Sequence, residues 1–327
     1  MEENFSRRKL IEPGHLRRLN ERSDLIGFLQ LFSHVFAILV VSILHYKVIE
    51  TWWLLCTGFC LGVLLNFLYA AQHELSHGTV FKTVKLNEFF GRIIGFLMIF
   101  PRDFDQVMHF AHHKWTQDWE RDGELVREPF TIGTYILWFL GFTYWYNRIS
   151  GILRRGRGII LEPYISKFEY KKVILESRLH LLGYFLIFLV SLYFQTWVAL
   201  TFWILPMLIT KPIHQMQNTI EHLGLTHKKD ILQNTRSTRT NFFMKWMCWQ
   251  MPYHTAHHTF PSVPFWKLKE LNSTIEKSSQ KVYSMGYIEF QIEILRRLWQ
   301  KDESQWPSNE VWVVSGKDGT QIRVPAE

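Results

Sequence analysis

Residues 51–77 read TWWLLCTGFCLGVLLNFLYAAQHELSH, and this stretch decides the fold. It has no charged side chain from Thr51 to Gln72, and it ends in His73-Glu74-Leu75-Ser76-His77. An apolar run of about 20 residues is long enough to cross the hydrocarbon core of a membrane as a helix. The stretch therefore predicts a membrane span that carries two histidines, four positions apart, at one end.

Three more apolar arms complete two predicted helical hairpins. Residues 25–44 are uncharged and are joined to the first stretch by a short link. Residues 179–213 form the second hairpin, whose arms meet near Gln195 and Trp197. Its second arm contains Pro206, which membrane helices tolerate. The sequence therefore predicts an all-α integral membrane protein with two transmembrane hairpins, or four spans.

Two shorter apolar segments, residues 89–100 and 131–146, are not expected to span. If residues 131–146 crossed the membrane, residues 147–178, with eight basic and three acidic side chains, would lie outside. Cytosolic loops are enriched in Lys and Arg, so we expect residues 131–146 to lie in the interface or to dip in and return. Both termini and a helical cap carrying the histidines are then cytosolic, at a bacterial inner membrane or the endoplasmic reticulum.

The composition favours a membrane protein over a nucleic-acid-binding protein. Aromatic residues make up 16% of the chain, with 14 Trp and 26 Phe, as expected where rings lie at membrane interfaces. The net charge is +8, but the basic residues flank apolar blocks, which is the pattern of membrane proteins. We expect a cytosolic segment over residues 1–24, a membrane domain over residues 25–300 and a polar tail over residues 301–327.

Two further histidine clusters repeat one spacing. They are His109-Phe110-Ala111-His112-His113 and His254-Thr255-Ala256-His257-His258. Positions i, i+3 and i+4 share one face of a helix. Three imidazoles in close contact resist protonation together, and neutral imidazole is a metal ligand. The repeated HxxHH pattern therefore predicts metal binding.

The first cluster by itself permits other interpretations. Its HExxH pattern is typical of zinc metalloproteases, with Glu74 as the general base, and a histidine pair with no ligand role is also possible. Zinc usually takes four ligands, whereas the three clusters supply eight histidines. Two metal ions are therefore expected, and imidazole-rich sets suit iron, copper or zinc.

The order and wording of the clusters resemble the membrane fatty acid desaturase and hydroxylase superfamily. The resemblance covers roughly residues 25–265 and includes FAHHKWTQD (residues 110–118), MPYH (251–254) and FPSVP (260–264). It implies a non-haem di-iron centre that uses O2 to break an unactivated C–H bond, with no catalytic residue beyond the metal centre. The implied ligands are His73, His77, His109, His112, His113, His254, His257 and His258.

The resemblance also implies a ninth ligand. Members similar to acyl-CoA desaturases carry NxxxH before the last histidine box, and this chain has Asn218-Thr219-Ile220-Glu221-His222. His222 is the implied iron ligand and Asn218 a possible water-mediated one, while His214 and His227 compete for the role. Glu221 departs from the family wording and is a candidate to orient a ligand imidazole from outside the ligand set.

Five other charged residues have open roles. Asp118 and Asp122 either hold imidazole N–H groups or form a solvated face. Glu74 either supports a ligand or faces solvent. Arg236 and Arg239 either bind a phosphate or carboxylate headgroup of the substrate or lie against anionic lipid.

Electrons are expected to come from another protein. The chain has no HPGG haem-binding sequence and no GxGxxG or CxxC clusters for a flavin, nicotinamide or iron–sulfur module. A cytochrome b5 or ferredoxin partner is therefore predicted. The basic stretch over residues 154–172 is a candidate dock for such an acidic carrier.

Desaturation of an acyl chain is the favoured function. Hydroxylation or ketone formation on a lipid, carotenoid or other hydrophobic molecule would use the same site. The two outcomes differ in whether the substrate radical loses a second hydrogen or recaptures oxygen. A membrane zinc protease would leave both HxxHH clusters unexplained, and a non-catalytic receptor or scaffold is the fourth hypothesis.

Overall fold

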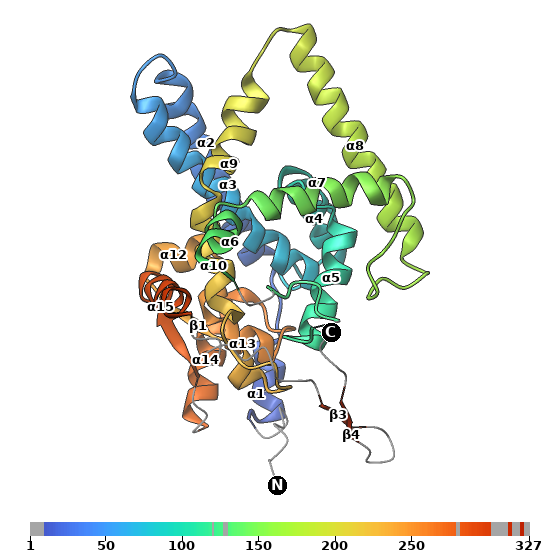
Figure 1. The fold of residues 1–327 in the computed structure, drawn as a ribbon, viewed down its shortest axis with the longest axis vertical. Helices are drawn as coiled ribbons and strands as arrows, with labels where there is room; N and C mark the ends of the chain where they lie inside the picture. The colour runs from blue at the N-terminus through green and yellow to red at the C-terminus, as the bar shows by residue number, and fades with distance from the viewer. Residues whose placement is uncertain are drawn as a thin grey trace.

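The computed structural model describes residues 10–119, 121–126, 130–278, 282–301, 313–315 and 321–323. The protein is mostly helical, as predicted. Long apolar helices extend toward one end of the molecule, and the helices that carry the histidines gather in the other half (Figure 1). Three helices, α2 (Asp24–Lys47), α3 (Trp53–His77) and α8 (Tyr170–Tyr193), are long and apolar enough to cross a membrane.

The first hairpin consists of α2 and α3. The Ser23 side chain caps the start of α2 by accepting a hydrogen bond from the Ile26 N–H at 3.4 Å. Helix α3 continues without a break through the first histidine box and ends at Gly78, whose φ of 68° is the left-handed conformation that glycine adopts easily. The first box therefore lies on the last turns of an apolar helix, as the sequence predicts.

The second hairpin is less regular than predicted. Its first arm is α8, and the chain turns near Gln195, which has a φ of 49°. The second arm contains a π-helix, η2 (Leu200–Ile204), the short α9 (Leu205–Ile209), and then α10 (Lys211–His222). Pro206 and Pro212 lack the N–H group that a continuous helix needs, which explains the interruptions. The apolar part of this arm, residues 200–209, is shorter than the three long helices.

The segment over residues 131–146 does not form one helix. It contains α6 (Ile132–Phe139) and the start of α7 (Phe142–Gly156), and Gly141 separates them with a φ of 89°. Helix α7 runs across the direction of α8 in Figure 1. The other short apolar segment lies in α4 (Val84–Leu97). Neither meets the length that a single span requires.

The two hairpins touch backbone to backbone where α3 meets α9. A Cβ atom added at Gly62 would lie 2.1 Å from the Pro206 carbonyl oxygen, so only glycine fits there. One turn further along α3, the Asn66 side-chain N–H group donates to the Met207 carbonyl at 2.8 Å and to the Thr210 hydroxyl at 2.9 Å. These contacts fix the helix of the first box against the arm that leads into α10.

The remaining described elements surround the histidines or lie beyond them. The helices are α1 (Pro13–Leu19), α5 (Arg102–Trp115), α11 (Ile231–Asn234), α12 (Phe242–Met247), η3 (Met251–Tyr253), α13 (His254–Thr259), η4 (Phe265–Lys267), α14 (Leu268–Lys277) and α15 (Tyr287–Gln300). Strands β1 (Ser237–Arg239) and β2 (Ser284–Gly286) pair in parallel, and β3 (Val313–Ser315) pairs antiparallel with β4 (Gln321–Arg323). Most of the predicted tail, and residues 1–9 of the predicted N-terminal segment, lie outside the described residues.

Candidate metal centre

Nine histidines gather into two neighbouring clusters. The first cluster contains His73, His77, His109, His113 and His257, and the second contains His112, His222, His254 and His258. Within each cluster, the nitrogen atoms that could bind a metal all lie within 4.8 Å of one another. The clusters adjoin, because the rings of His113 and His258 are 4.2 Å apart. The structure thus brings together all nine histidines that the sequence singled out.

Four helices supply these side chains. The first box lies at the end of α3, the second on α5, His222 at the end of α10, and the third on α13. Several of the Nε2 atoms face one another at close range. The separations are 2.7 Å for His77–His109 and His73–His257, 2.8 Å for His222–His254, 2.9 Å for His109–His113 and 3.1 Å for His113–His257.

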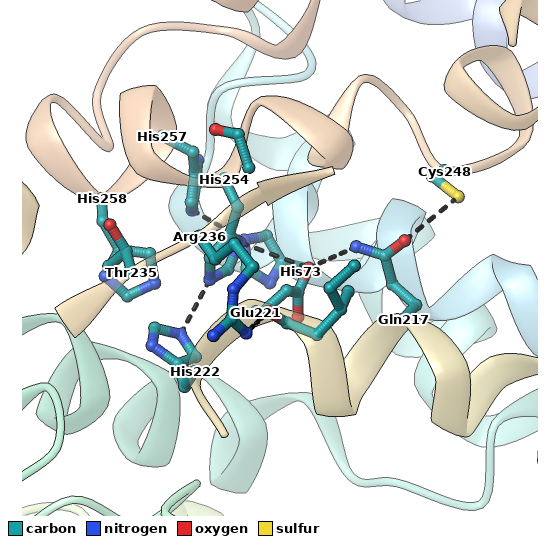
Figure 2. A network of polar contacts seen from close by, with 12 residues as sticks. His73, Gln217, Glu221, His222, Thr235, Arg236, Cys248, His254, His257 and His258 are labelled. Carbon is teal, nitrogen blue, oxygen red and sulfur yellow. Dashed lines mark hydrogen bonds and ion pairs between the residues drawn. The ribbon is translucent and has the colours of Figure 1, made fainter. Parts of the chain in front are cut away.

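The hydrogen bonds on the outer side of the rings show whether the inner nitrogens carry a hydrogen or a free lone pair. The Nδ1 atom of His222 lies 2.9 Å from the Asn234 carbonyl oxygen, which can only accept, so Nδ1 carries the hydrogen. Burial, followed by the charge of His112, lowers the pKa of His222 to about 3, so the ring is neutral. Its Nε2 is then a bare lone pair that faces the Nε2 of His254 (Figure 2). Converging lone pairs repel unless a cation binds them, so the donor set fits a metal ion.

Two carboxylates support one ligand in each cluster. Glu124 accepts a hydrogen bond from His109 Nδ1 at 2.8 Å, and Asp122 accepts from His112 Nδ1 at 2.9 and 3.0 Å. Burial opposes the ionisation of Glu124, but the charges of His109 and His112 outweigh it and lower the pKa of this carboxyl to about 2. A carboxylate on the outer nitrogen fixes both the tautomer and the orientation of a ligand imidazole.

Glu74 and Glu221 approach the third box from its other side. Glu74 is completely buried, accepts a hydrogen bond from the Thr79 hydroxyl at 2.7 Å, and lies 3.6 Å from His257 Nδ1. Glu221 accepts from the Gln217 side chain at 2.6 Å and lies 3.3 Å from His254 Nδ1. Burial raises the pKa of Glu221 to about 8. Glu74 does not face solvent, and both carboxyls lie where the outer partner of a ligand would lie.

A left-handed turn brings Asp122 and Glu124 back to α5. Gln117 has a φ of 68°, which reverses the chain just after the second box. Its N–H group donates to Asp122 at 2.8 Å, and its side chain donates to the His222 carbonyl at 3.0 Å. The sequence marked Asp122 as a candidate but gave no signal for Glu124, because no common spacing rule predicts a left-handed glutamine.

The third box is presented by a strained segment. Trp249 and Gln250, two consecutive residues other than glycine, have φ values of 49° and 61°. The Trp249 side chain is fully buried, and its indole N–H donates to His34 Nδ1 on α2 at 3.2 Å. Strained backbone persists only where the surrounding packing enforces it, and it concentrates at functional sites. The packing of Trp249 therefore sets the direction in which α13 starts.

The competing candidates lie outside both clusters. His214 contacts Lys211, and His227 Nδ1 donates to the Gln117 carbonyl at 2.8 Å. The Asn218 side chain donates to Gln215 at 3.1 Å. Asp118 pairs with Arg121 at 2.6 Å and not with a histidine of either cluster among the described residues.

The two arginines of the expected headgroup site have structural partners. Arg236 is buried, and its Nη1 atom donates to the carbonyl oxygens of Ile220 at 2.6 Å and Leu223 at 3.3 Å, where it satisfies the end of α10. Arg239 pairs with Glu289. Arg236 therefore supports the segment that carries His222 instead of facing lipid (Figure 2).

A cavity of about 1180 Å³ borders both clusters. His73, His109, His112, His222 and His254 line one part of it, and it extends to Tyr144, Arg148 and Arg154 of α7. A separate depression of about 430 Å³ reaches His77 of the first cluster. The candidate centre is thus accessible from two directions.

The comparison with known families agrees with this geometry. The family model for fatty acid desaturases matches residues 50–290, which covers the first, second and third boxes and His222. That match spans more than half of the chain, and the family is typically di-iron. This chain, an integral membrane protein with three long apolar helices and two histidine clusters that could each hold a metal, belongs to the fatty acid desaturase family.

Proposed function

We propose that the protein is an O2-dependent, non-haem di-iron oxidase that introduces a double bond into an acyl chain. The observation that carries this proposal is the pair of adjoining histidine clusters beside a large cavity in a chain of this family. The five histidines of the first cluster and the four of the second are the proposed ligands of the two iron ions. When bound, the irons supply the activation of O2 and the removal of hydrogen from an unactivated C–H bond.

The protein's own residues have positioning roles in this proposal. The cavity holds the substrate chain beside His73 and His112. Asp122 and Glu124 keep the Nδ1 protons of His112 and His109 in place, so that each Nε2 lone pair points inward. Glu221 and Glu74 lie near the Nδ1 atoms of His254 and His257 without a hydrogen bond to them, and they are the proposed outer partners of these two ligands.

The proposed topology has four spans with the metal centre on the cytosolic side. The three long helices support three spans, and residues 200–209 with their flanks supply the fourth. An even number of spans returns the end of α3 and the start of α10 to the same side, where the two helices supply His73 and His222. The excess of basic residues in 147–178 supports a cytosolic location for that side.

The electron donor is proposed to dock at the depression beside His77, which includes the Lys172 end of the basic stretch 154–172, and not at the other end of that stretch, residues 154–157. Arg154 and Arg155 both pair with Glu162, at 2.5 and 2.7 Å, and Arg155 is buried. The depression is lined by four basic residues, Arg22, Arg92, Arg102 and Lys172, and by the acidic Glu88 and Asp103. Arg92 and Arg102 pair with Asp103, and Lys172 pairs with Glu169, so the choice of this place rests on its position beside the first cluster. Because His77 borders it, an acidic cytochrome b5 or ferredoxin seated there would lie close to the first cluster.

The reaction is tested by mass spectrometry of total lipids from a host that expresses the chain, with His257→Ala as the control. Products that lack two hydrogens, absent with His257→Ala, would support desaturation and locate the new bond. Products that gain one oxygen would replace desaturation by hydroxylation at the same site. Iron analysis of both purified proteins separates a missing substrate from a missing metal centre.

The dock is tested with the double change Arg22→Glu and Lys172→Glu. We expect the rate of reduction by an acidic carrier at low salt to fall about tenfold, because steering depends on complementary charge. Iron content should not change. Arg157→Glu, near the other end of the basic stretch, should have little effect, and a larger loss there than in the double variant would favour a dock at residues 154–157 instead.

A further inference from the structure

The large cavity has a second polar region, away from the metal clusters. Tyr69 on α3, Tyr144 and Arg148 on α7, and His214 on α10 all line it. Each has one buried polar atom without a hydrogen-bond partner among the described residues: the two tyrosine hydroxyls, Arg148 Nη1 and His214 Nε2. Buried polar groups are normally paired, so four unpaired atoms around one cavity indicate a missing ligand.

Two basic side chains, Arg148 and Lys211, stand at this region. Lys211 has no exposed surface, its ammonium group lies 3.1 Å from the centre of the Tyr144 ring, and it contacts His214 Nδ1. The Arg148 guanidinium packs over Phe100 at 3.4 Å and over Tyr144 at 4.2 Å. The charges of Asp105 and Glu124 act on Arg148, but neither carboxylate forms a salt bridge with it within the described parts of the chain. Asp105 lines the same cavity but accepts from the Ser76 hydroxyl at 2.9 Å.

The unpaired atoms are donors. The Lys211 side chain can donate to His214 Nδ1 whether or not it is protonated, and in that arrangement the hydrogen of the neutral ring is on Nε2. His214 Nε2 and Arg148 Nη1 therefore offer N–H groups, and the tyrosines offer O–H groups. Donors and positive charge that converge on one cavity match an oxyanion, because hydrogen bonds to a charged acceptor are the strong ones.

The helices fix how far this region lies from the metal clusters. Tyr69 precedes His73 by one turn of α3, about 6 Å at the rise of an α-helix, and His214 precedes His222 by two turns of α10, about 12 Å. An oxyanion at Tyr69 and His214 would be separated from the clusters by the length of several methylene groups. The same cavity continues between the two regions.

We propose that Arg148 and His214, with Tyr69 and Tyr144, bind the oxyanion end group of the substrate while a carbon several bonds away reaches the metal clusters, and that Lys211, which lies against Tyr144 and His214 without lining the cavity, supports them. The inference rests on the proposed function and narrows its substrate class to amphiphiles with a carboxylate or phosphate end. A neutral ester of the same chain leaves the basic groups buried without a counter-charge. Ester forms should therefore bind more weakly than the free acid.

The test measures binding, so it does not depend on turnover. Radiolabelled oleate is displaced from the purified iron-loaded protein by unlabelled oleate, methyl oleate or oleoyl lysophosphatidate. Wild-type protein should prefer an anionic competitor over methyl oleate by about tenfold or more. Arg148→Gln and Lys211→Met should each lose most of this preference while still binding methyl oleate, which shows that the cavity remains folded.

Matched controls remove exposed charges elsewhere. Arg17→Gln and Lys171→Met change solvent-exposed side chains and should keep the wild-type preference. Equal binding of oleate and methyl oleate by wild-type protein, or an unchanged preference in both cavity variants, would overturn the proposal. Strongest displacement by lysophosphatidate identifies a phosphate end, and strongest displacement by oleate identifies a carboxylate.

The binding test and the lipid mass spectrometry can fail independently of each other. An anionic preference that depends on Arg148 in a protein without oxidised products would leave the oxyanion site standing and remove the proposed reaction. Desaturated products from a protein without any anionic preference would remove only the oxyanion site.

Discussion

The two histidine clusters both take ligands from the second and third boxes, but each box gives its larger share to a different cluster. From the second box, His109 and His113 enter the first cluster and His112 enters the second. From the third box, His254 and His258 enter the second cluster and His257 enters the first. In each HxxHH box the two histidines four positions apart stay together, and the histidine between them crosses over.

The HxxHH spacing explains how one box can supply ligands to both clusters. On the face that the three positions share, positions i and i+4 point within about 40° of each other, while position i+3 points about 60° to the other side of position i. One box can therefore hold a pair in one cluster and connect to the other. His73 and His77, which lack such an intermediate histidine, both join the first cluster, and His222 completes the second. The two clusters are expected to form one cooperative unit.

The largest effect on activity is expected when one ligand is removed from each cluster in turn. His113→Ala and His258→Ala should each lower activity by at least about 100-fold, because ligand loss also disturbs the neighbouring cluster. Iron per protein should fall below one ion in both variants if binding is cooperative. Retention of about one iron in each variant would show instead that the clusters load independently.

The outer carboxylates provide the next test. Asp122→Asn should reduce iron affinity or activity by about 10- to 100-fold, since partners of ligand imidazoles have effects of this size. Glu124→Gln should have the smaller effect of the two. The Asp122 side chain is 1% exposed and also accepts from the Gln117 N–H, whereas the Glu124 side chain is 30% exposed. The two variants are compared by iron titration under the same conditions. An equal or larger loss of iron affinity in Glu124→Gln would show that the exposure of the carboxylate does not determine the size of the effect.

Support of the backbone around His222 should matter less for chemistry and more for stability. Arg236→Gln removes the donor to the Ile220 and Leu223 carbonyls, which should cost about 1–3 kcal/mol. A lower melting temperature with partial loss of iron is expected, and Arg236→Lys should recover part of it. An unchanged melting temperature would mean that water or another group satisfies the end of α10.

The smallest expected effect is at Thr116. Its hydroxyl donates to the His112 carbonyl at 2.8 Å and lies 3.3 Å from His258 Nδ1. Thr116→Val keeps the shape of the side chain and removes only neutral hydrogen bonds, each worth about 1 kcal/mol. Activity should change by only a few-fold. A loss as large as that of Asp122→Asn would place Thr116 among the principal supports of the second cluster.

The sequence predicted much of the site because histidine spacing reports helix geometry directly. The nine histidines could be selected before any fold was known, and the structure gathers all nine. Glu124 could not be found this way, since its position depends on the left-handed turn at Gln117. The buried partners of Arg155 and Arg236 were equally invisible, because a sequence shows charge but not what faces it.

The fold was predicted in the same uneven way. The spans over α2 and α3 follow from apolar length alone. The second hairpin arm was expected as a simple helix, and Pro206 and Pro212 divide it into η2, α9 and α10. The break at Gly141 was likewise not located, because a glycine inside an apolar run marks a turn only when its neighbours impose a positive φ. The four-span topology and its sidedness stay predictions.

The crossing-over of the third box has a consequence for biosynthesis. Neither cluster is complete until the chain has been made through His257 and His258, although His73 and His77 leave the ribosome far earlier. During that interval the first box and the second box carry histidines without their final partners. The proposed metal sites would therefore become complete only late in synthesis, and a truncated chain that ends before residue 254 would lack ligands of both clusters.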